Sequence, residues 1–159
     1  GLLNNIEYYY SVTSFSKPDI VTNFPSVESS INASGIEVVA GTGVPETVGE
    51  VAAVPNPYRG DVYYNLFNPP WEKAGFSGVW MEQDRRIQFI NLPYPSEVVI
   101  YTLSGDVVRK LQHNDPVKGY KDWDLTSNVG QTVASGLYLF SAKDLKNGAT
   151  QNGKFVIIK

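Results

Sequence analysis

Bulky apolar and polar side chains alternate along most of the sequence after residue 50. Successive side chains of a strand point to opposite faces, so a period of two indicates a strand with one face against a core. No stretch of about 12 residues keeps the period of a helix. The predicted strands are VAAV (51–54), DVYYNLF (61–67), RRIQFIN (85–91), EVVIYTL (97–103), VVRKLQH (107–113), KDWDLT (121–126), GLYLFSAKDL (136–145) and KFVIIK (154–159).

Turn residues separate these segments at short, regular intervals. Ser104-Gly105-Asp106 predicts a tight hairpin, and Asn147-Gly148 and Asn152-Gly153 predict the turn before the last strand. Short strands about 8–12 residues apart are typical of a sandwich. The chain is therefore predicted to be all-β, an immunoglobulin-like antiparallel β-sandwich with an extended N-terminal strand and a linker. Ten Tyr, seven Phe and three Trp agree with this class, because aromatic residues favour strands.

The N-terminal segment IEYYYSVTSF (6–15) also alternates, but it carries bulky groups on both faces. Residues 16–50 are rich in Pro, Ser, Asn and Gly, and only IEVVA (36–40) is strand-like, which is typical of a linker. The sequence thus predicts three parts: a terminal strand (1–15), a linker (16–50) and the sandwich (51–159). The first strand has no obvious partner in this chain.

Charge and composition exclude several classes of protein. The net charge is −3 and Lys and Arg are scattered, so nucleic acid binding is not expected. The absence of Cys excludes disulfides and zinc–thiolate sites. No apolar run approaches the ~20 residues of a membrane span, so membrane insertion is not expected. Because the chain begins at Gly1, we expect it to be a processed or excised piece of a longer protein.

The last segment, GKFVIIK, is unusual because chain ends are normally poorly ordered. Its four consecutive apolar residues predict a strand buried on both faces. Burial of four such side chains contributes roughly 6–12 kcal/mol. This is comparable with the roughly 5–15 kcal/mol stability of a whole domain. Deletion of 154–159 is therefore expected to leave the sandwich unfolded.

Four segments together resemble one known module. They are VPNPYRG (54–60), IYTLSGDVVRKL (100–111), WDLTSNVGQTVASGLYLF (123–140) and GKFVIIK (153–159). In this order they are similar to the FlgD-like immunoglobulin-like domain, close to the sorting domains of the type IX secretion system. The positions that carry the resemblance are Pro55, Asn56, Pro57, Gly105, Gly136, Tyr138, Gly153, Lys154, Phe155, Val156, Ile157, Ile158 and Lys159.

The resemblance implies a non-catalytic module of a secreted or cell-surface bacterial protein. Its role would be secretion sorting, surface attachment and structural assembly, with secretion machinery or cell-surface components as partners. YYYSVTSF in addition resembles the final strand of a fibronectin type III domain, which implies an upstream module. Residues 68–84 are longer than the family pattern, and their role stays open.

Few residues suggest chemistry. The single histidine, His113, lies near a strand end and is interpreted as solvent-exposed. A catalytic role is not expected for it, since no GxSxG motif is present. Asp122 and Asp124 could share one face of a strand and bind calcium, or flank an inward Trp123 and stay solvated. The latter is favoured, so no cofactor is expected. Three acidic residues, Glu72, Glu82 and Asp84, lie close to Trp71 and Trp80 in the sequence. Nothing in the sequence fixes the distance between two of them as a catalytic pair requires, so no enzyme is predicted.

Two other functions remain open. The N-terminal strand could add to the sheet of another copy and build a filament or tube, since exposed strand backbone seeks pairing. The residues for this strand addition are Tyr8, Tyr9, Tyr10, Val12 and Phe15. Alternatively, an aromatic face could bind carbohydrate, with Trp71 and Trp80 as main contacts beside Tyr58 and Tyr63.

Overall fold

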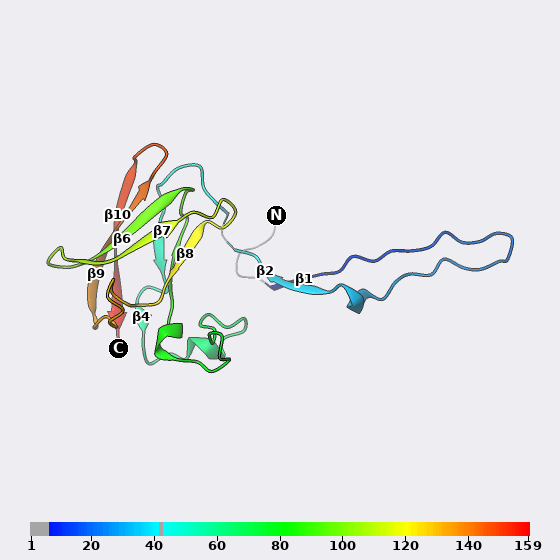
Figure 1. Ribbon diagram of the computed structural model, residues 1–159, viewed down its shortest axis with the longest axis horizontal. Coiled ribbons are helices and arrows are strands. Elements are labelled where there is room, and N and C mark those ends of the chain that lie inside the picture. Colours follow the sequence, from blue (N-terminus) through cyan, green and yellow to red (C-terminus); the bar gives the residue numbers. More distant parts are fainter. Residues whose placement is uncertain (1–6, 42) are drawn as a thin grey trace. The chain divides into compact units, whose positions relative to one another are not determined.

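The computed structural model describes residues 7–41 and 43–159 (Figure 1). Within these residues the regular elements are ten strands and three short 3₁₀ helices, so the fold is all-β as predicted. The helices are η1 (Ile31–Ala33), η2 (Tyr64–Leu66) and η3 (Glu82–Asp84). No helix in the described part of the chain has the length and apolarity needed to cross a bilayer. The chain divides into two compact units, one ending at Ala40 and the other beginning at Gly41.

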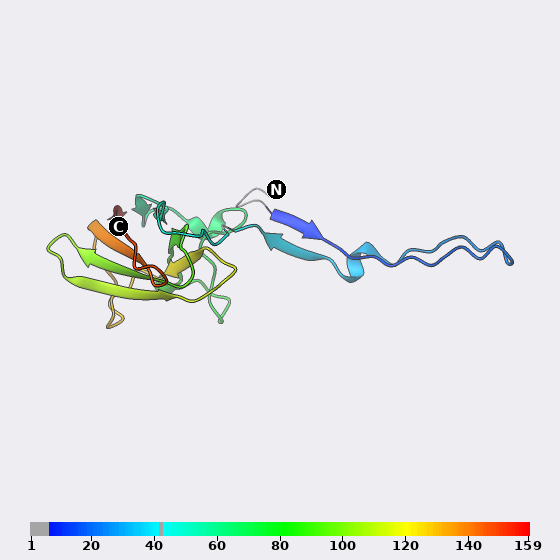
Figure 2. The same ribbon diagram turned by 90° about the horizontal axis from the view of Figure 1, so that it is seen from above.

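The second unit is a β-sandwich of two sheets (Figure 1, Figure 2). The smaller sheet has the order β3-β5-β8, formed by β3 (Ala52–Val54), β5 (Ile87–Ile90) and β8 (Tyr120–Trp123). The larger has the order β4-β10-β9-β6-β7, formed by β4 (Tyr58–Arg59), β10 (Thr150–Ile158), β9 (Gly136–Asp144), β6 (Ser96–Thr102) and β7 (Val107–His113). Neighbouring strands are antiparallel except β4 and β10, which are parallel.

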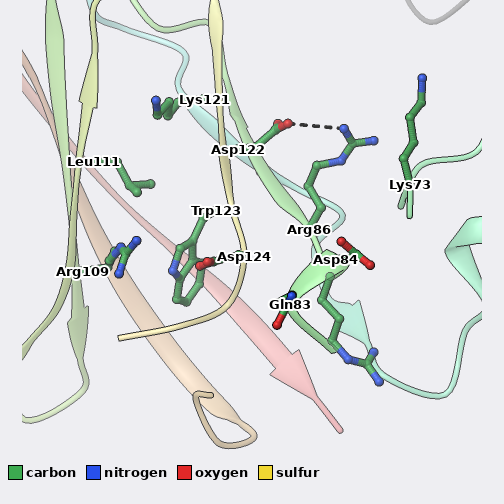
Figure 3. A pocket seen from close by; sticks show the side chains of 11 residues that line it. Lys73, Gln83, Asp84, Arg86, Arg109, Leu111, Lys121, Asp122, Trp123 and Asp124 are labelled. Carbon is green, nitrogen blue, oxygen red and sulfur yellow. Dashed lines mark hydrogen bonds and ion pairs between the residues drawn. The ribbon is translucent and has the colours of Figure 1, made fainter. Parts of the chain in front are cut away.

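Aromatic side chains join the two sheets. Phe89 of the smaller sheet lies edge-on to Phe140 and Phe155 of the larger, at centroid distances of 5.3 and 5.8 Å. Trp123 points inward from β8 and lies 5.9 Å from Phe155, whereas its neighbour Asp122 is directed at Arg86 (Figure 3). The alternation in the sequence therefore places one face of each strand in a common core.

The predicted strand over 61–67 is wrong. The chain leaves β4 at Gly60, and Tyr64 lies in η2, where its ring stacks on Tyr58 at 5.3 Å. The Tyr64 hydroxyl accepts a hydrogen bond from the Arg59 amide at 3.2 Å, while Tyr63 is 74% exposed. Packing of Tyr64 against Tyr58 thus replaces a strand by a compact turn.

The first unit differs from the expectation of an unpaired strand. β1 (Glu7–Tyr10) pairs antiparallel with β2 (Ile36–Val39). Between them the two stretches of chain run side by side in both views, joined by bridges at Phe15–Glu28 and Asp19–Phe24 (Figure 1, Figure 2). Tyr8, Tyr9 and Tyr10 therefore already have a partner strand within the chain. The segment expected to be a linker contains the turn and the second strand of this hairpin, and the first compact unit ends at Ala40.

Candidate functional site at the last strand

Strand β10 occupies an interior position in the larger sheet. It pairs with β9 from Thr150 to Ile157 and with β4 at Ile157 and Ile158. Phe155 and Ile157 are buried, but Val156 is only half-buried and Ile158 is 47% exposed. The expectation of burial on both faces is therefore wrong, because only one face of β10 meets the other sheet. Two large side chains, rather than four, contribute fully to the core.

The segment VPNPYRG holds one side of β10. Asn56 uses its side-chain amide in place of main-chain pairing: Oδ1 accepts from the Val156 amide at 3.1 Å, and Nδ2 donates to the Lys154 carbonyl at 3.4 Å. Pro55 and Pro57, which flank it, have no N–H to donate. Two residues further on, Tyr58 and Arg59 continue the pairing as β4.

Gly60 ends this contact by a close main-chain approach. Its amide donates to the Ile158 carbonyl at 2.6 Å. A Cβ atom at Gly60 would lie 3.1 Å from the Cα of Lys159, tighter than ordinary van der Waals contact. The glycine of the motif therefore permits the backbones of β4 and β10 to meet.

The segment ASGLY holds the other side of β10. The Ser135 hydroxyl accepts from the Lys159 amide at 2.8 Å and lies 3.4 Å from the Lys159 carbonyl oxygen. Gly136 is the partner of Ile157 at the start of β9. Tyr138 donates its hydroxyl to the Ala134 carbonyl at 2.9 Å, so its ring is fixed against the core.

Gly153 lies within β10 and not in a turn before it, as the sequence suggested. It pairs with Phe140, whose ring covers it, and a Cβ there would lie 2.3 Å from Phe140 Cζ. The ring of Phe155, two residues on, stacks on Tyr138 at 5.8 Å. Gly105 is placed elsewhere, at φ +94° in the β6–β7 turn. The structure thus gathers the residues of the resemblance around β10, with Gly105 apart.

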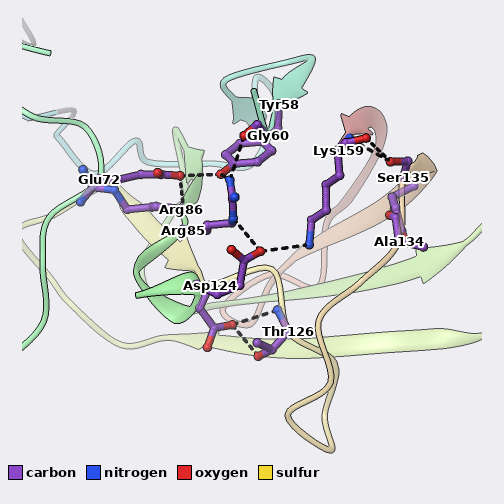
Figure 4. Close-up of polar contacts among 12 residues, drawn as sticks. Tyr58, Gly60, Glu72, Arg85, Arg86, Asp124, Thr126, Ala134, Ser135 and Lys159 are labelled. Carbon is purple, nitrogen blue, oxygen red and sulfur yellow. Dashed lines mark hydrogen bonds and ion pairs between the residues drawn. The ribbon is translucent and has the colours of Figure 1, made fainter. Parts of the chain in front are cut away.

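A chain of polar contacts links β4 to the end of β10 (Figure 4). Glu72, which is buried, accepts hydrogen bonds from the Tyr58 hydroxyl at 2.6 Å and the Arg86 amide at 3.1 Å. Arg85 donates to the same Tyr58 oxygen at 2.9 Å and pairs with Glu82 at 2.7 Å. The Lys159 ammonium lies 3.8 Å from this Glu82 carboxylate. Glu72 and Glu82 belong to the segment 68–84, whose role the sequence leaves open, and through Glu82 this segment contacts Lys159.

Burial changes two pKa values in this network. The pKa of Tyr58 is raised, mainly by desolvation and next by the hydrogen bond to Glu72. The pKa of Lys159 is lowered, mainly by desolvation, although the nearby Glu82 carboxylate acts in the opposite direction. Tyr58 is therefore neutral at physiological pH and acts as a hydrogen-bonding bridge.

The three acidic residues near Trp71 are all engaged by neighbours. Glu72 and Glu82 belong to the network above, and Asp84 accepts from the Met81 amide at 2.7 Å. The absence of enzymatic activity stays a prediction.

The proposed aromatic face is not formed as a single surface. Tyr58 is buried, and Trp71 donates its indole N–H to the Arg86 carbonyl at 3.0 Å, with the Arg86 guanidinium 4.8 Å from its ring centroid. Tyr63 and Trp80 do line one pocket of about 340 Å³. Two of the four aromatic residues are therefore used for internal packing.

His113 is buried at 1% exposure, which corrects the expectation of a solvent-exposed position. Burial lowers its pKa, while the Asp115 carboxylate opposes this effect. His113, Ser96 and Asp144 are register partners at one end of the larger sheet, and all three are buried. The sequence contains a signal for this burial, because His113 lies two residues after Leu111 on the same strand and therefore on the same inward face.

Asp122 and Asp124 do not converge on one point. Asp122 pairs with Arg86 at 3.3 Å and accepts from Gln88 at 2.8 Å. Asp124 accepts from the amide and hydroxyl of Thr126, at 3.2 and 2.6 Å. Among residues 7–41 and 43–159, no group of three or more His, Asp or Glu side chains is arranged to hold a metal ion. The fold and this site define a β-sandwich module in which β10 is paired with a strand on each side.

No family model and no curated protein matches the chain. Among the solved structures that show similarity are PorZ and PorU. PorZ, described as an essential bacterial surface component of the type-IX secretion system of Porphyromonas gingivalis, has 18% identity and a TM-score of 0.48 over 69% of this chain. Dimeric latent PorU from Porphyromonas gingivalis has 17% identity and a TM-score of 0.41 over 98%. The chain spans 11% and 12% of the length of these two proteins.

Proposed function

We propose that the second unit is a non-catalytic module for secretion sorting and surface attachment of an exported protein, recognised by secretion machinery as a folded domain. The observation that supports this function is the convergence of the resemblance residues on β10. Asn56 and Gly60 bind one side of the strand, and Ser135 binds the other. A sorting element of this kind is a fixed shape and not a flexible tail.

The end of β10 is the part of this shape that a receptor would read. Ile158 is 47% exposed although its neighbour Ile157 is buried. Its main-chain atoms are held by Arg59 and Gly60, so the exposed side chain has a fixed position. A receptor that binds a preordered strand end loses little conformational entropy on binding, which favours affinity.

A fusion assay tests the proposal. Residues 1–159 are fused to a neutral passenger in a host with type IX secretion, and the passenger is localised by fractionation and surface labelling. We expect the unaltered fusion at the cell surface and the Ile158→Ser fusion in the periplasm. Leu103→Ser, an equally apolar exposed residue in the β6–β7 turn, is the matched control and should be exported. Melting of each purified chain shows whether the fold is retained.

Retention of the unaltered fusion in the periplasm contradicts the sorting function. Equal export of Ile158→Ser and Leu103→Ser contradicts the role of the strand end alone. A loss of export accompanied by a large fall in melting temperature calls for Ile158→Val, which keeps the apolar character and should restore export.

The first unit supports a second candidate, assembly through the hairpin. Its inner side is joined by serine hydroxyls, such as Ser34 with Val12 and Ser26 with Ser16. Its large apolar side chains point outward: Val12 82%, Phe15 77%, Ile20 93%, Val21 94% exposed. A two-stranded ribbon is marginally stable in water, so such a surface favours a partner such as another copy.

Light scattering discriminates this candidate. If the hairpin drives assembly, the chain should form higher-mass species that Phe15→Ser, Ile20→Ser and Val21→Ser together abolish. The matched control replaces three exposed apolar residues of the second unit: Leu103, Val117 and Val129. Monomers of equal mass for all chains at high concentration contradict assembly.

A further inference from the structure

A pocket opens between the edges of the two sheets. β7 ends the larger sheet and β8 ends the smaller one, and the pocket between them has a volume of about 370 Å³ (Figure 3). Arg109 has the same parity as Leu111 on β7, and Lys121 the same as Trp123 on β8. Because residues two apart in a strand share a face, both cations stand on the inner faces of the sandwich. Leu111 and Trp123 are buried, so they form its apolar floor.

The side chains that line the pocket carry a net positive charge, although the net charge of the whole chain is negative. Its lining contains five cationic and three acidic side chains, a difference of +2 (5 − 3). The whole chain has a net charge of −3. The cations come from separate elements, and Figure 3 shows Arg109 and Lys121 on one side of the pocket and Arg86 on the other.

The acidic side chains of the pocket are occupied by their own neighbours. They accept hydrogen bonds as follows: Asp84 from Met81, Asp122 from Gln88 and Arg86, and Asp124 from Thr126. Arg109 donates one N–H to the Ser127 carbonyl at 2.7 Å, which orients its guanidinium. Within the described residues, neither Arg109 nor Lys121 forms an ion pair. The remaining donors of two inward-pointing cations are thus unmatched by carboxylates.

We propose that this pocket binds an anionic group, a carboxylate or a phosphate, between Arg109 and Lys121. A guanidinium presents two parallel N–H groups that suit two oxygens of such an anion, and the ammonium supplies a third donor from the facing sheet. The apolar floor reduces screening by water, which strengthens the attraction. Inward charges on edge strands also oppose edge-to-edge aggregation, and the experiment separates this role from binding.

The test is an NMR titration of the full chain with inorganic phosphate and, separately, with citrate. We expect saturable shifts of the Trp123 indole N–H and of the Arg109 side-chain N–H signal, weakened by added salt. R109Q/K121Q should lower the affinity by at least about tenfold, since two charge-assisted hydrogen bonds are lost. K110Q/K143Q removes the same charge from exposed positions and should leave the affinity unchanged.

The contrast between the two double variants decides the proposal. Equal weakening in both, or shifts that never saturate with either anion, overturns it, because bulk charge alone would then account for the effect. Tighter binding of phosphate or of citrate identifies the group that the pocket selects. If R109Q/K121Q melts much lower than the unaltered chain, K121R replaces it as the probe. Retained binding by K121R with loss by K121Q supports the site, and equal loss in both overturns it.

Discussion

At the scale of single residues, small side chains decide how closely the backbones around β10 approach. Gly60 and Gly153 both lie where a Cβ would meet other atoms at 3.1 Å or less. At Gly153 the neighbour is an aromatic ring in the core, which has little room to move in a closely packed interior. At Gly49, by contrast, a Cβ would meet nothing within 4 Å.

Gly153→Ala should destabilise the second unit by about 1–3 kcal/mol, the usual cost of overpacking. The reason is the 2.3 Å separation between the added Cβ and Phe140 Cζ, which forces the ring to shift. Urea unfolding measures the change, with Gly49→Ala as the control that should stay close to the unaltered chain. Equal urea midpoints for Gly153→Ala and Gly49→Ala would contradict the prediction, because the Phe140 ring would then move aside without a cost in stability.

His113 predicts a pH dependence of stability. Burial lowers its folded pKa below the ordinary value of 6.5, with Asp115 opposing and Lys121 adding to this effect. Because the unfolded chain then binds more protons, stability should be fully present above pH 6.5 and fall as the pH drops toward the folded pKa. Thermal melts between pH 7.5 and 5 measure the slope, and His113→Leu should flatten it. An unchanged slope in His113→Leu would assign the effect to other groups.

At the scale of elements, alternation in the sequence predicted most strands of the sandwich, because a period of two directly reports which face is buried. It failed at 61–67, where Tyr64 packs on Tyr58 in a turn, since local alternation carries no signal of that long-range contact. It also could not pair 7–10 with 36–39, because a partner strand is set by register and not by composition.

The candidate site was predictable as a set of residues but not as a geometry. Asn56, Gly136 and Lys159 follow from the resemblance, yet their meeting at β10 depends on contacts between residues far apart in sequence. Asn56 and Val156, for example, are 100 positions apart. The network from Glu72 to Lys159 was missed, because no spacing rule links a loop glutamate to the last strand. The sequence signal for this network is Tyr58, because a tyrosine buried in a strand needs a hydrogen-bonding partner for its hydroxyl.

Removal of 154–159 should abolish cooperative folding of the second unit. The deletion takes Phe155 and Ile157 from the core, a loss of roughly 3–6 kcal/mol, and it separates β4 from β9. Differential scanning calorimetry and near-UV circular dichroism measure the transition, with Ile158→Ser as the mild control. A truncated chain that melts cooperatively near the original temperature would contradict the central position of β10.

At the scale of the whole molecule, the core of the sandwich draws on the second unit alone. Its buried residues run from Val51 to Ile157, with Val48 packed against them at the margin. The first unit is held by a hairpin ladder and serine hydrogen bonds and has its own set of contacts. The stability of one unit should therefore be independent of the other.

Residues 41–159 expressed alone should melt close to the full chain, within about 2 °C, because every residue of the hydrophobic core lies in this part of the chain. Thermal denaturation followed by near-UV circular dichroism provides the measurement. A clear fall in melting temperature for the shorter chain would show that the hairpin stabilises the sandwich. The same pair of chains at several concentrations distinguishes that effect from association.

The interior position of β10 has a consequence for the timing of folding during synthesis. Translation produces β10 after every other strand of the sandwich, yet β4 and β9 need it between them. Until the ribosome has released this segment, the backbone of β9 has no hydrogen-bonding partner on the edge that β10 occupies. We therefore expect the larger sheet to stay unclosed between β4 and β9 during synthesis and to close only after β10 has emerged.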